Sequence, residues 1–416
     1  MLNDSLAQAD PKITQIMQDE LERQQKTLML IPSENYASRA VMQAMGSIFT
    51  NKYAEGYPGA RYYNGCENYD RLEQLAIDRA KKLFRAEHAN VQVHTGSQAN
   101  MAAYYALLEP GDRILAMSVD QGGHLTHGKA QNFSGKIYEP HFYTVDRETG
   151  LIDYANVLER AKEVRPKLIV AGASAYPRII DFQRFREIAD EVGAYLMADI
   201  AHICGLVAAG SHPDPVPYCD VVTSTTHKTL RGPRGALIMC REEYAKALDS
   251  AVFPGVQAGP LMQIVAAKAV CFREAETYGF REYQRQIVRN TQAMCQSLLE
   301  EDFEPVTGGT DNHLLLIDLT NKEMTGREAA DLLEAAGMVC NKNLVPYDPL
   351  NAQETSGIRP GTPGLTTRGM REEEMHQIGK WMAEVIHKGR EDEDVLTRVR
   401  GEVEDLCSEF PIYLDL

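Results

Sequence analysis

The sequence lacks the patterns of a metal centre, a disulfide framework, a membrane span or an export signal. Its eight cysteines are scattered, and no two of them form a CxxC pair. No run approaches 18 uninterrupted apolar residues, and the first residues (MLNDSL) do not have the basic-then-apolar pattern of a signal peptide. We therefore expect a cytoplasmic protein that holds no metal.

Basic residues are also in short supply. The sequence has 43 lysines and arginines and 59 aspartates and glutamates, which gives a net charge of −16. Nucleic acids and anionic membranes bind to basic surfaces, so neither is expected as the main partner. An anionic ligand of this protein must therefore meet positive charge that is gathered locally.

The 416 residues, 44% of them apolar, are enough for two or three domains. Between about residues 85 and 240, short apolar runs alternate with helical patterns. This alternation predicts βαβ units and a mostly parallel sheet inside a three-layer α/β/α domain. The expected strands are 90–93, 113–117, 167–171, 195–198, 221–222 and 236–239, and the expected helices include 99–108, 154–163 and 182–192.

The flanking regions have other patterns. Residues 8–30 are typical of an amphipathic helix, and 258–300 of one long helical stretch. A strand-like run at 312–318 and a helix at 326–336 predict a smaller α+β domain, in which 355–368 is expected to be an irregular functional loop. The predicted division is an N-terminal helical arm (1–30), a large domain (31–280) and a small C-terminal domain (281–416).

Lys228 lies in the run TSTTHKTLRG (223–232), directly after the short apolar strand. A lysine at its ordinary pKa of about 10.4 is a poor nucleophile, so a Schiff-base lysine needs neighbours that favour its neutral form. Thr225 and His227 are such neighbours in the same loop. An isolated lysine at a strand end is more often an ordinary surface residue.

Three further polar clusters follow predicted strands, where open α/β sheets bind ligands. Thr95, Gly96 and Ser97 precede a helix and can cradle a phosphate, although such turns are often only structural. Asp199 ends an apolar strand and can hold a protonated pyridine nitrogen, or simply cap the next helix. His124 follows two glycines and can stack on a ring; with His127 it could instead bind a metal, but no third ligand accompanies the pair.

Together, an anion cradle, a strand-end aspartate, a stacking histidine and a lysine after a later strand make up a pyridoxal phosphate site. With these residues the chain resembles the serine hydroxymethyltransferase family over about residues 10–413. The resemblance is carried by LIPSEN (30–35), TNKYAEGYPG (50–59), RYY (61–63), GGHLTHG (122–128), SAYPR (174–178), HKTLRGPRG (227–235), FPGVQ (253–257) and TSGIR (355–359).

The resemblance implies a fold-type I pyridoxal-phosphate transferase of one-carbon metabolism and amino-acid biosynthesis. It would interconvert L-serine and tetrahydrofolate with glycine and 5,10-methylenetetrahydrofolate. The implied cofactor-binding residues are Lys228 as the Schiff-base lysine, Asp199 at the ring nitrogen, His124 on the ring, Thr95, Gly96 and Ser97 at the phosphate, and Ser174, His202 and His227 around the ring.

The resemblance also implies substrate-binding residues and a subunit arrangement. Arg359 would hold the amino-acid carboxylate, with Ser33 and His202 assisting. Glu55 and Tyr63 would handle protons, and His202 and Thr225 would be catalytic residues beside the lysine. Leu125 and Asn343 would contact substrate, Asn343 at the folate ring. Tyr53 and Gly259 would reach the phosphate of an adjacent subunit, which implies a homodimer, or a dimer of such dimers, contacted by the N-terminal arm.

Three positions depart from the family pattern, two of them (Gln121 and Asn64) near the expected substrate region and one (Ala258) beside the expected phosphate-binding turn. Gln121 stands where a histidine is usual, Asn64 where a glycine is usual, and Ala258 at the first glycine of a Gly-Gly-Pro turn. Two enzymatic alternatives therefore stand beside the serine enzyme, an α-methylserine hydroxymethyltransferase and a threonine or allo-threonine aldolase. A more remote alternative is a non-catalytic paralogue that acts by binding, for example to RNA.

Overall fold

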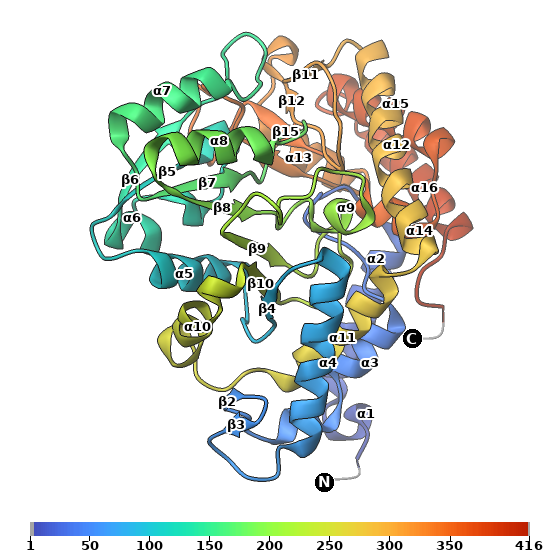
Figure 1. Cartoon of the computed structure of the whole chain (residues 1–416). Helices are drawn as coiled ribbons and strands as arrows, with labels where there is room; N and C mark the ends of the chain where they lie inside the picture. Colours follow the sequence, from blue (N-terminus) through green and yellow to red (C-terminus); the bar gives the residue numbers. More distant parts are fainter. Residues whose placement is uncertain (1–3, 415–416) are drawn as a thin grey trace.

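A seven-stranded sheet forms the centre of the molecule (Figure 1). The computed structural model describes residues 4–414. The strand order is β4-β10-β9-β8-β7-β5-β6, and within the described residues β10 is the one strand of this sheet that runs against the others. The strands are β4 His88–Asn90, β5 Arg113–Met117, β6 Glu139–Tyr143, β7 Leu168–Gly172, β8 Tyr195–Asp199, β9 Val221–Thr225 and β10 Ala236–Cys240.

Helices cover both faces of this sheet because its strands are apolar on both sides. In β5, Ile114 and Ala116 point into one core, whereas Leu115 and Met117 point into the other. The first core is covered by α5 (Gly96–Leu107), α6 (Phe133–Ile137) and α10 (Glu242–Ser250). The second is covered by α4 (Glu67–Phe84), α7 (Tyr154–Val164), α8 (Phe182–Val192), α9 (Cys204–Ala209) and α11 (Met262–Ala275).

The C-terminal part forms a second sheet with a core of its own. Its strands, in the order β11-β12-β15-β14, are Glu304–Pro305, Ile317–Asp318, Gly357–Arg359 and Asn341–Asn343. The helices around it are α12 (Tyr278–Glu300), α13 (Gly326–Ala335), α14 (Pro363–Arg368), α15 (Glu372–Lys388) and α16 (Glu393–Glu409). This architecture confirms the predicted α/β class, while the domain boundaries near residues 30 and 280 stay predictions.

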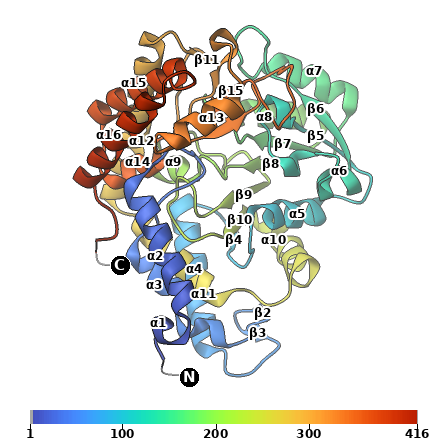
Figure 2. The ribbon, with the colours of Figure 1, turned by 180° about the vertical axis from the view of Figure 1, so that it is seen from behind.

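The N-terminal part runs along the outside of both sheets. It contains α1 (Leu6–Ala9), α2 (Pro11–Lys26), β1 (Leu28–Met29), α3 (Arg39–Met45) and the hairpin β2 (Gly56–Tyr57) and β3 (Ala60–Arg61). α2 lies against α16, as seen from behind in Figure 2, and β1 pairs in parallel with β13 (Met338–Val339). No helix among the described residues is long and apolar enough to cross a membrane.

The strand predicted at 90–93 was wrong beyond its first residue, since β4 ends at Asn90. Side chains replace the ladder here. The Lys268 ammonium donates to the carbonyls of Val91 and Val93 at 2.6 and 2.9 Å, and Gln257 Nε2 donates to that of Gln92 at 3.0 Å. The segment is extended and leads directly into the loop at Thr95.

Three predictions for the C-terminal half were also wrong in part. The single helical stretch at 258–300 is broken between α11 and α12, where the Thr277 hydroxyl caps α12. The run at 312–318 is strand only at its end. Before it, the Leu314 amide donates to the Asn312 side chain and the Leu315 amide donates to the Pro360 carbonyl. The loop predicted at 355–368 holds β15 and α14, which begins at a proline in its first turn. The strand β6 was not predicted.

Arg368 ties the N-terminal arm to the last helix. Its buried guanidinium donates to the carbonyls of Gln24 and Gln25 at 2.9 Å, and to those of Cys407 and Phe410 at 3.0 Å. These carbonyls lie at the ends of α2 and α16, where helices leave acceptors without partners.

We expect Arg368→Met to lower the free energy of unfolding by about 2–4 kcal/mol, because several buried carbonyls lose a charged donor. Urea unfolding followed by circular dichroism measures this change. The control is Arg273→Met, whose side chain is 66% exposed beside Glu276, and which should change stability by less than about 1 kcal/mol. Equal effects of the two substitutions would contradict the role given to Arg368.

Candidate active site

Two adjoining cavities open at the carboxyl ends of β7, β8 and β9. The inner cavity has a volume of about 260 Å³ and the outer one of about 430 Å³. Parallel strands bring these ends to one edge of the sheet, which is where open α/β sheets bind ligands. The residues that line both cavities are His124, Ser174, His202, His227, Lys228 and Arg234.

The start of α5 forms one wall of the inner cavity. Thr95 caps the helix through its hydroxyl, which accepts from the Gln98 amide at 3.3 Å, and Gly96 and Ser97 begin the first turn. A side chain at Gly96 would press on the Thr225 methyl, 2.7 Å from its Cβ position. The free amides of this first turn therefore face a space that stays open, with the Arg234 cation in the same cavity.

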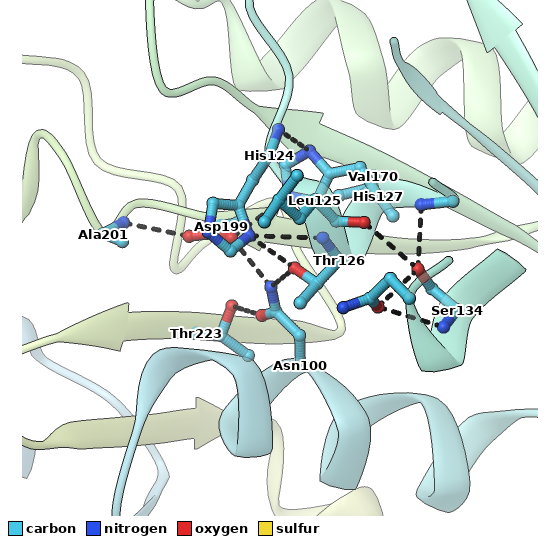
Figure 3. A network of polar contacts seen from close by, with 12 residues as sticks. Asn100, His124, Leu125, Thr126, His127, Ser134, Val170, Asp199, Ala201 and Thr223 are labelled. Atoms are coloured by element: carbon cyan, nitrogen blue, oxygen red, sulfur yellow. Dashed lines mark hydrogen bonds and ion pairs between the residues drawn. The ribbon is translucent and has the colours of Figure 1, made fainter. Parts of the chain in front are cut away.

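Asp199 ends β8 and also lines the inner cavity. Figure 3 shows its polar contacts. Its Oδ2 accepts from Asn100 Nδ2 at 2.9 Å and from His127 Nε2 at 3.1 Å, and its Oδ1 accepts from the Ala201 amide at 3.0 Å. Burial alone would raise the pKa of this carboxyl, but the His127 contact and the Asn100 bond outweigh it and hold the pKa well below its usual range. The group is therefore an anion at neutral pH.

The hydrogen bonds of His127 and His124 fix where their protons lie. His127 Nδ1 accepts from the His124 amide at 3.2 Å, so Nε2 carries the proton that is donated to Asp199. His124 Nδ1 accepts from the Thr126 amide at 3.3 Å and lies 2.8 Å from the Thr126 hydroxyl. Burial lowers the pKa of His124 to about 4. His124 is thus a neutral, flat ring on the wall of both cavities.

Lys228 lies between the two cavities, in the loop after β9. Burial is the main cause that lowers its pKa to about 8; Asp199 opposes the shift, whereas Arg359 and Arg234 add to it. Its backbone carbonyl accepts from Asn35 Nδ2 at 3.0 Å. The loop is therefore anchored to the N-terminal segment while the amine faces the cavities.

These groups fit pyridoxal phosphate. The open first turn of α5 with the nearby Arg234 suits the phosphate, the ionised Asp199 suits a protonated ring nitrogen, and the amine of Lys228 suits the aldehyde. The family model of serine hydroxymethyltransferase matches residues 6–382. The chain belongs to this family. Its members are enzymes that use pyridoxal phosphate and take tetrahydrofolate as cosubstrate for one-carbon transfer.

The outer cavity of this serine hydroxymethyltransferase family member brings together four of the residues predicted to bind substrate: Ser33, Leu125, Asn343 and Arg359. Arg359 is the cation among them. One of its terminal nitrogens donates to the Ser174 carbonyl and the other to Asn341 Oδ1 at 3.5 Å, while its buried Nε has no partner within the described chain. An orphaned donor of this kind is costly unless an anion pairs with it.

The predicted residues around Lys228 also lie at these cavities. Thr225 lines the inner one, and its hydroxyl donates to the Ala201 carbonyl at 3.3 Å. His227 lines both, and burial lowers its pKa to about 3, so it is neutral. His202 lines both and is hydrogen-bonded through Nδ1 to His313.

Four predicted residues do not line either cavity. Tyr53, Glu55, Tyr63 and Gly259 form a separate cluster in which the rings of Tyr53 and Tyr63 lie 5.8 Å apart. Tyr53 is 65% exposed and Tyr63 47% exposed. Within one subunit, the two tyrosine rings are therefore exposed to solvent, Glu55 and Gly259 are partly buried beside them, and none of the four lines the cavities at Lys228.

Sequence reasoning missed Asn100, Thr126, Thr223 and Arg234. Asn100 is the centre of the missed set, because it donates to Asp199 and Thr126 and accepts from Thr223 at 2.6 Å. The signal for it was its place one turn into α5, on the side that faces the β8 and β9 ends. The described residues contain no cluster of three His, Cys, Asp or Glu side chains placed to hold a metal ion.

We expect the cofactor-free protein to bind pyridoxal phosphate at a rate that follows the neutral fraction of Lys228. With a pKa of about 8, the rate constant should rise about tenfold per pH unit below pH 8 and level off above it. Stopped-flow absorbance between pH 6 and 10 measures this profile. A rate that keeps rising to pH 10 would contradict the lowered pKa, and Lys228→Arg is the control that should form no lysine-bound chromophore.

Proposed function

We propose that this chain is a serine hydroxymethyltransferase that interconverts L-serine and tetrahydrofolate with glycine and 5,10-methylenetetrahydrofolate. The observation that carries the proposal is the position of Lys228, between an inner cavity that ends in Asp199 and an outer one that holds Arg359. This arrangement suits a cofactor in the inner cavity and an α-amino acid in the outer one. We further propose that the enzyme is cytoplasmic.

Bound pyridoxal phosphate supplies an electron sink for bonds at the α-carbon of the amino acid. The ionised Asp199 keeps a proton on the ring nitrogen, and His127 and Asn100 keep Asp199 in place. Arg359 holds the substrate carboxylate through its planar fork, and Ser33 and His202 orient it. Lys228 is neutral often enough near pH 8 to act as a nucleophile and to accept a proton.

The three positions that depart from the family pattern line neither cavity of their own subunit, and L-serine is therefore the substrate that we propose. Gln121 is buried away from both cavities, and its side chain bonds to Asp120 and to the Val145 amide. Asn64 is exposed. Ala258 is absent from the described residues with positive φ, so its methyl group does not strain the turn. None of the three lines the outer cavity of its own subunit.

The cluster of Tyr53, Glu55, Tyr63 and Gly259, whose two tyrosines are exposed, supports a homodimer, or a dimer of such dimers. A general acid or base acts only where it reaches a substrate, which an exposed surface of a single subunit does not hold. Large apolar side chains of the same segment are also exposed: Ile48 is 79% exposed, and Tyr62, next to Tyr63, is 73% exposed. We propose that this face covers the cavity mouth of a second copy, so that Glu55 acts in the partner's site. Arm helix α2, whose Ile16 is 62% exposed, extends the same interface.

We expect kcat/KM for L-serine with tetrahydrofolate to exceed that for α-methylserine by at least about tenfold, because an extra methyl group must fit an unaltered pocket. Steady-state assays with serine, α-methylserine and allo-threonine, with and without folate, measure this. Preference for α-methylserine, or cleavage of allo-threonine that outpaces the folate-dependent reaction, would favour the alternative enzymes. Lys228→Ala should be inactive with every substrate.

We expect Lys228→Ala and Glu55→Gln subunits to complement each other. A mixed dimer then has one site with an intact lysine from one chain and an intact Glu55 from the other. Random pairing should restore about a quarter of the parent activity after equal mixing and reassociation. Mixing Lys228→Ala with Lys228→Met is the control that should restore nothing. No gain in the first mixture would place Glu55 in its own subunit's site.

A further inference from the structure

His313 is a buried histidine that does not line either cavity. It is 0% exposed, and its ring lies 5.5 Å from that of His202, centroid to centroid. His202 Nδ1 and His313 Nε2 are 3.2 Å apart. Because His202 lines both cavities, His313 lies directly behind a residue of the site.

The segment that carries His313 is fastened to the loop after β7. The Asp311 amide donates to the Pro177 carbonyl at 2.9 Å, and Asn312 Nδ2 donates to the Tyr176 carbonyl at 3.0 Å. The His313 carbonyl accepts from the Thr362 amide at 3.2 Å. The ring is thus held against His202 by contacts from both sides.

Both imidazoles are neutral, which leaves one proton between them. Burial, with the nearby cations Lys228 and Arg359, lowers the pKa of each ring well below its usual value. One ring must then donate and the other accept. The direction of this bond decides whether His202 presents an N–H or a lone pair at Nε2.

The surroundings of His313 decide the direction. Its Nδ1 is buried and has no hydrogen-bond partner. A proton there would be an orphaned donor, and orphaned buried N–H groups are rarer than unused acceptors. The proton therefore belongs on His313 Nε2, so that His202 Nδ1 accepts and His202 Nε2 keeps its own proton. No hydrogen-bond partner of His202 Nε2 lies within the described residues, and the ring borders the cavities.

We propose that His313 is a positioning residue that donates from Nε2 to His202 Nδ1 and so holds His202 as a donor from Nε2 toward anionic groups in the cavities. The proposal rests on the proposed function, because those groups are the substrate carboxylate and the phenolic oxygen of the cofactor. A donor that is fixed in advance loses no free energy to tautomer exchange when the anion arrives.

Two variants separate hydrogen bonding from packing. His313→Gln keeps an amide donor near the Nε2 position, whereas His313→Leu fills the volume without a donor. We expect the Kd for glycine, measured by calorimetry on the holoenzyme, and the KM for serine to rise about tenfold in His313→Leu, with kcat changed less than about threefold. His313→Gln should stay within about threefold of the parent. His212→Leu, a buried histidine outside both cavities, is the matched control and should bind glycine as the parent does.

Nitrogen NMR of holoenzyme with labelled histidines measures the tautomer in the parent protein. The only variant that it requires is His202→Asn, which assigns the His202 signals. The expected spectrum has His202 protonated at Nε2 and unprotonated at Nδ1. The opposite tautomer, or equal loss of glycine binding in the Leu and Gln variants, would overturn the proposal. A parent that has the expected tautomer but binds no glycine would refute the proposed function and leave the His313 bond standing.

Discussion

The site depends on keeping one carboxylate ionised at the end of a buried strand. Asp199 lies in a cavity wall where burial favours the neutral acid, and an isolated anion there would cost several kcal/mol. Three donors from three segments, Asn100 on α5, His127 in the loop after β5 and the Ala201 amide, reverse that preference. The parallel sheet brings those segments to one edge, so the ionised state of Asp199 depends directly on the fold.

Histidine tautomers are used repeatedly around this carboxylate. The His124 amide fixes the proton of His127, Thr126 fixes that of His124, and we infer that His313 fixes that of His202. In each ring, one nitrogen is held by a hydrogen bond from within the chain, so the other nitrogen has a single defined role as donor or acceptor. Neutral rings suit a cavity that already contains Lys228, Arg234 and Arg359, because further cations there would repel one another.

Local signals in the sequence were enough for most strands of the central sheet, β6 excepted, and for the groups at the strand ends. Asp199 and Lys228 each follow an apolar strand, and that position predicted where they lie, as it did for the loop at Thr95. What the sequence could not predict depends on side chains far away along the chain. β4 ends at Asn90, and the carbonyls of residues 91–93 accept instead from Lys268 and Gln257, more than 160 residues later. His313 reaches His202 only because two separate sheets meet, and no periodicity encodes such a meeting.

The distribution of charge links the composition to the chemistry. The chain as a whole carries −16 charges, yet its cavities gather Lys228, Arg234, Lys342 and Arg359 against few acids. An anionic surface with a cationic cavity focuses anions toward that one opening and repels them elsewhere. A phosphate, an amino-acid carboxylate and the acidic tail of a folate all share this sign. The same excess of acidic residues that argues against nucleic acid as a partner therefore directs small anions to the Lys228 site, because the rest of the surface repels them.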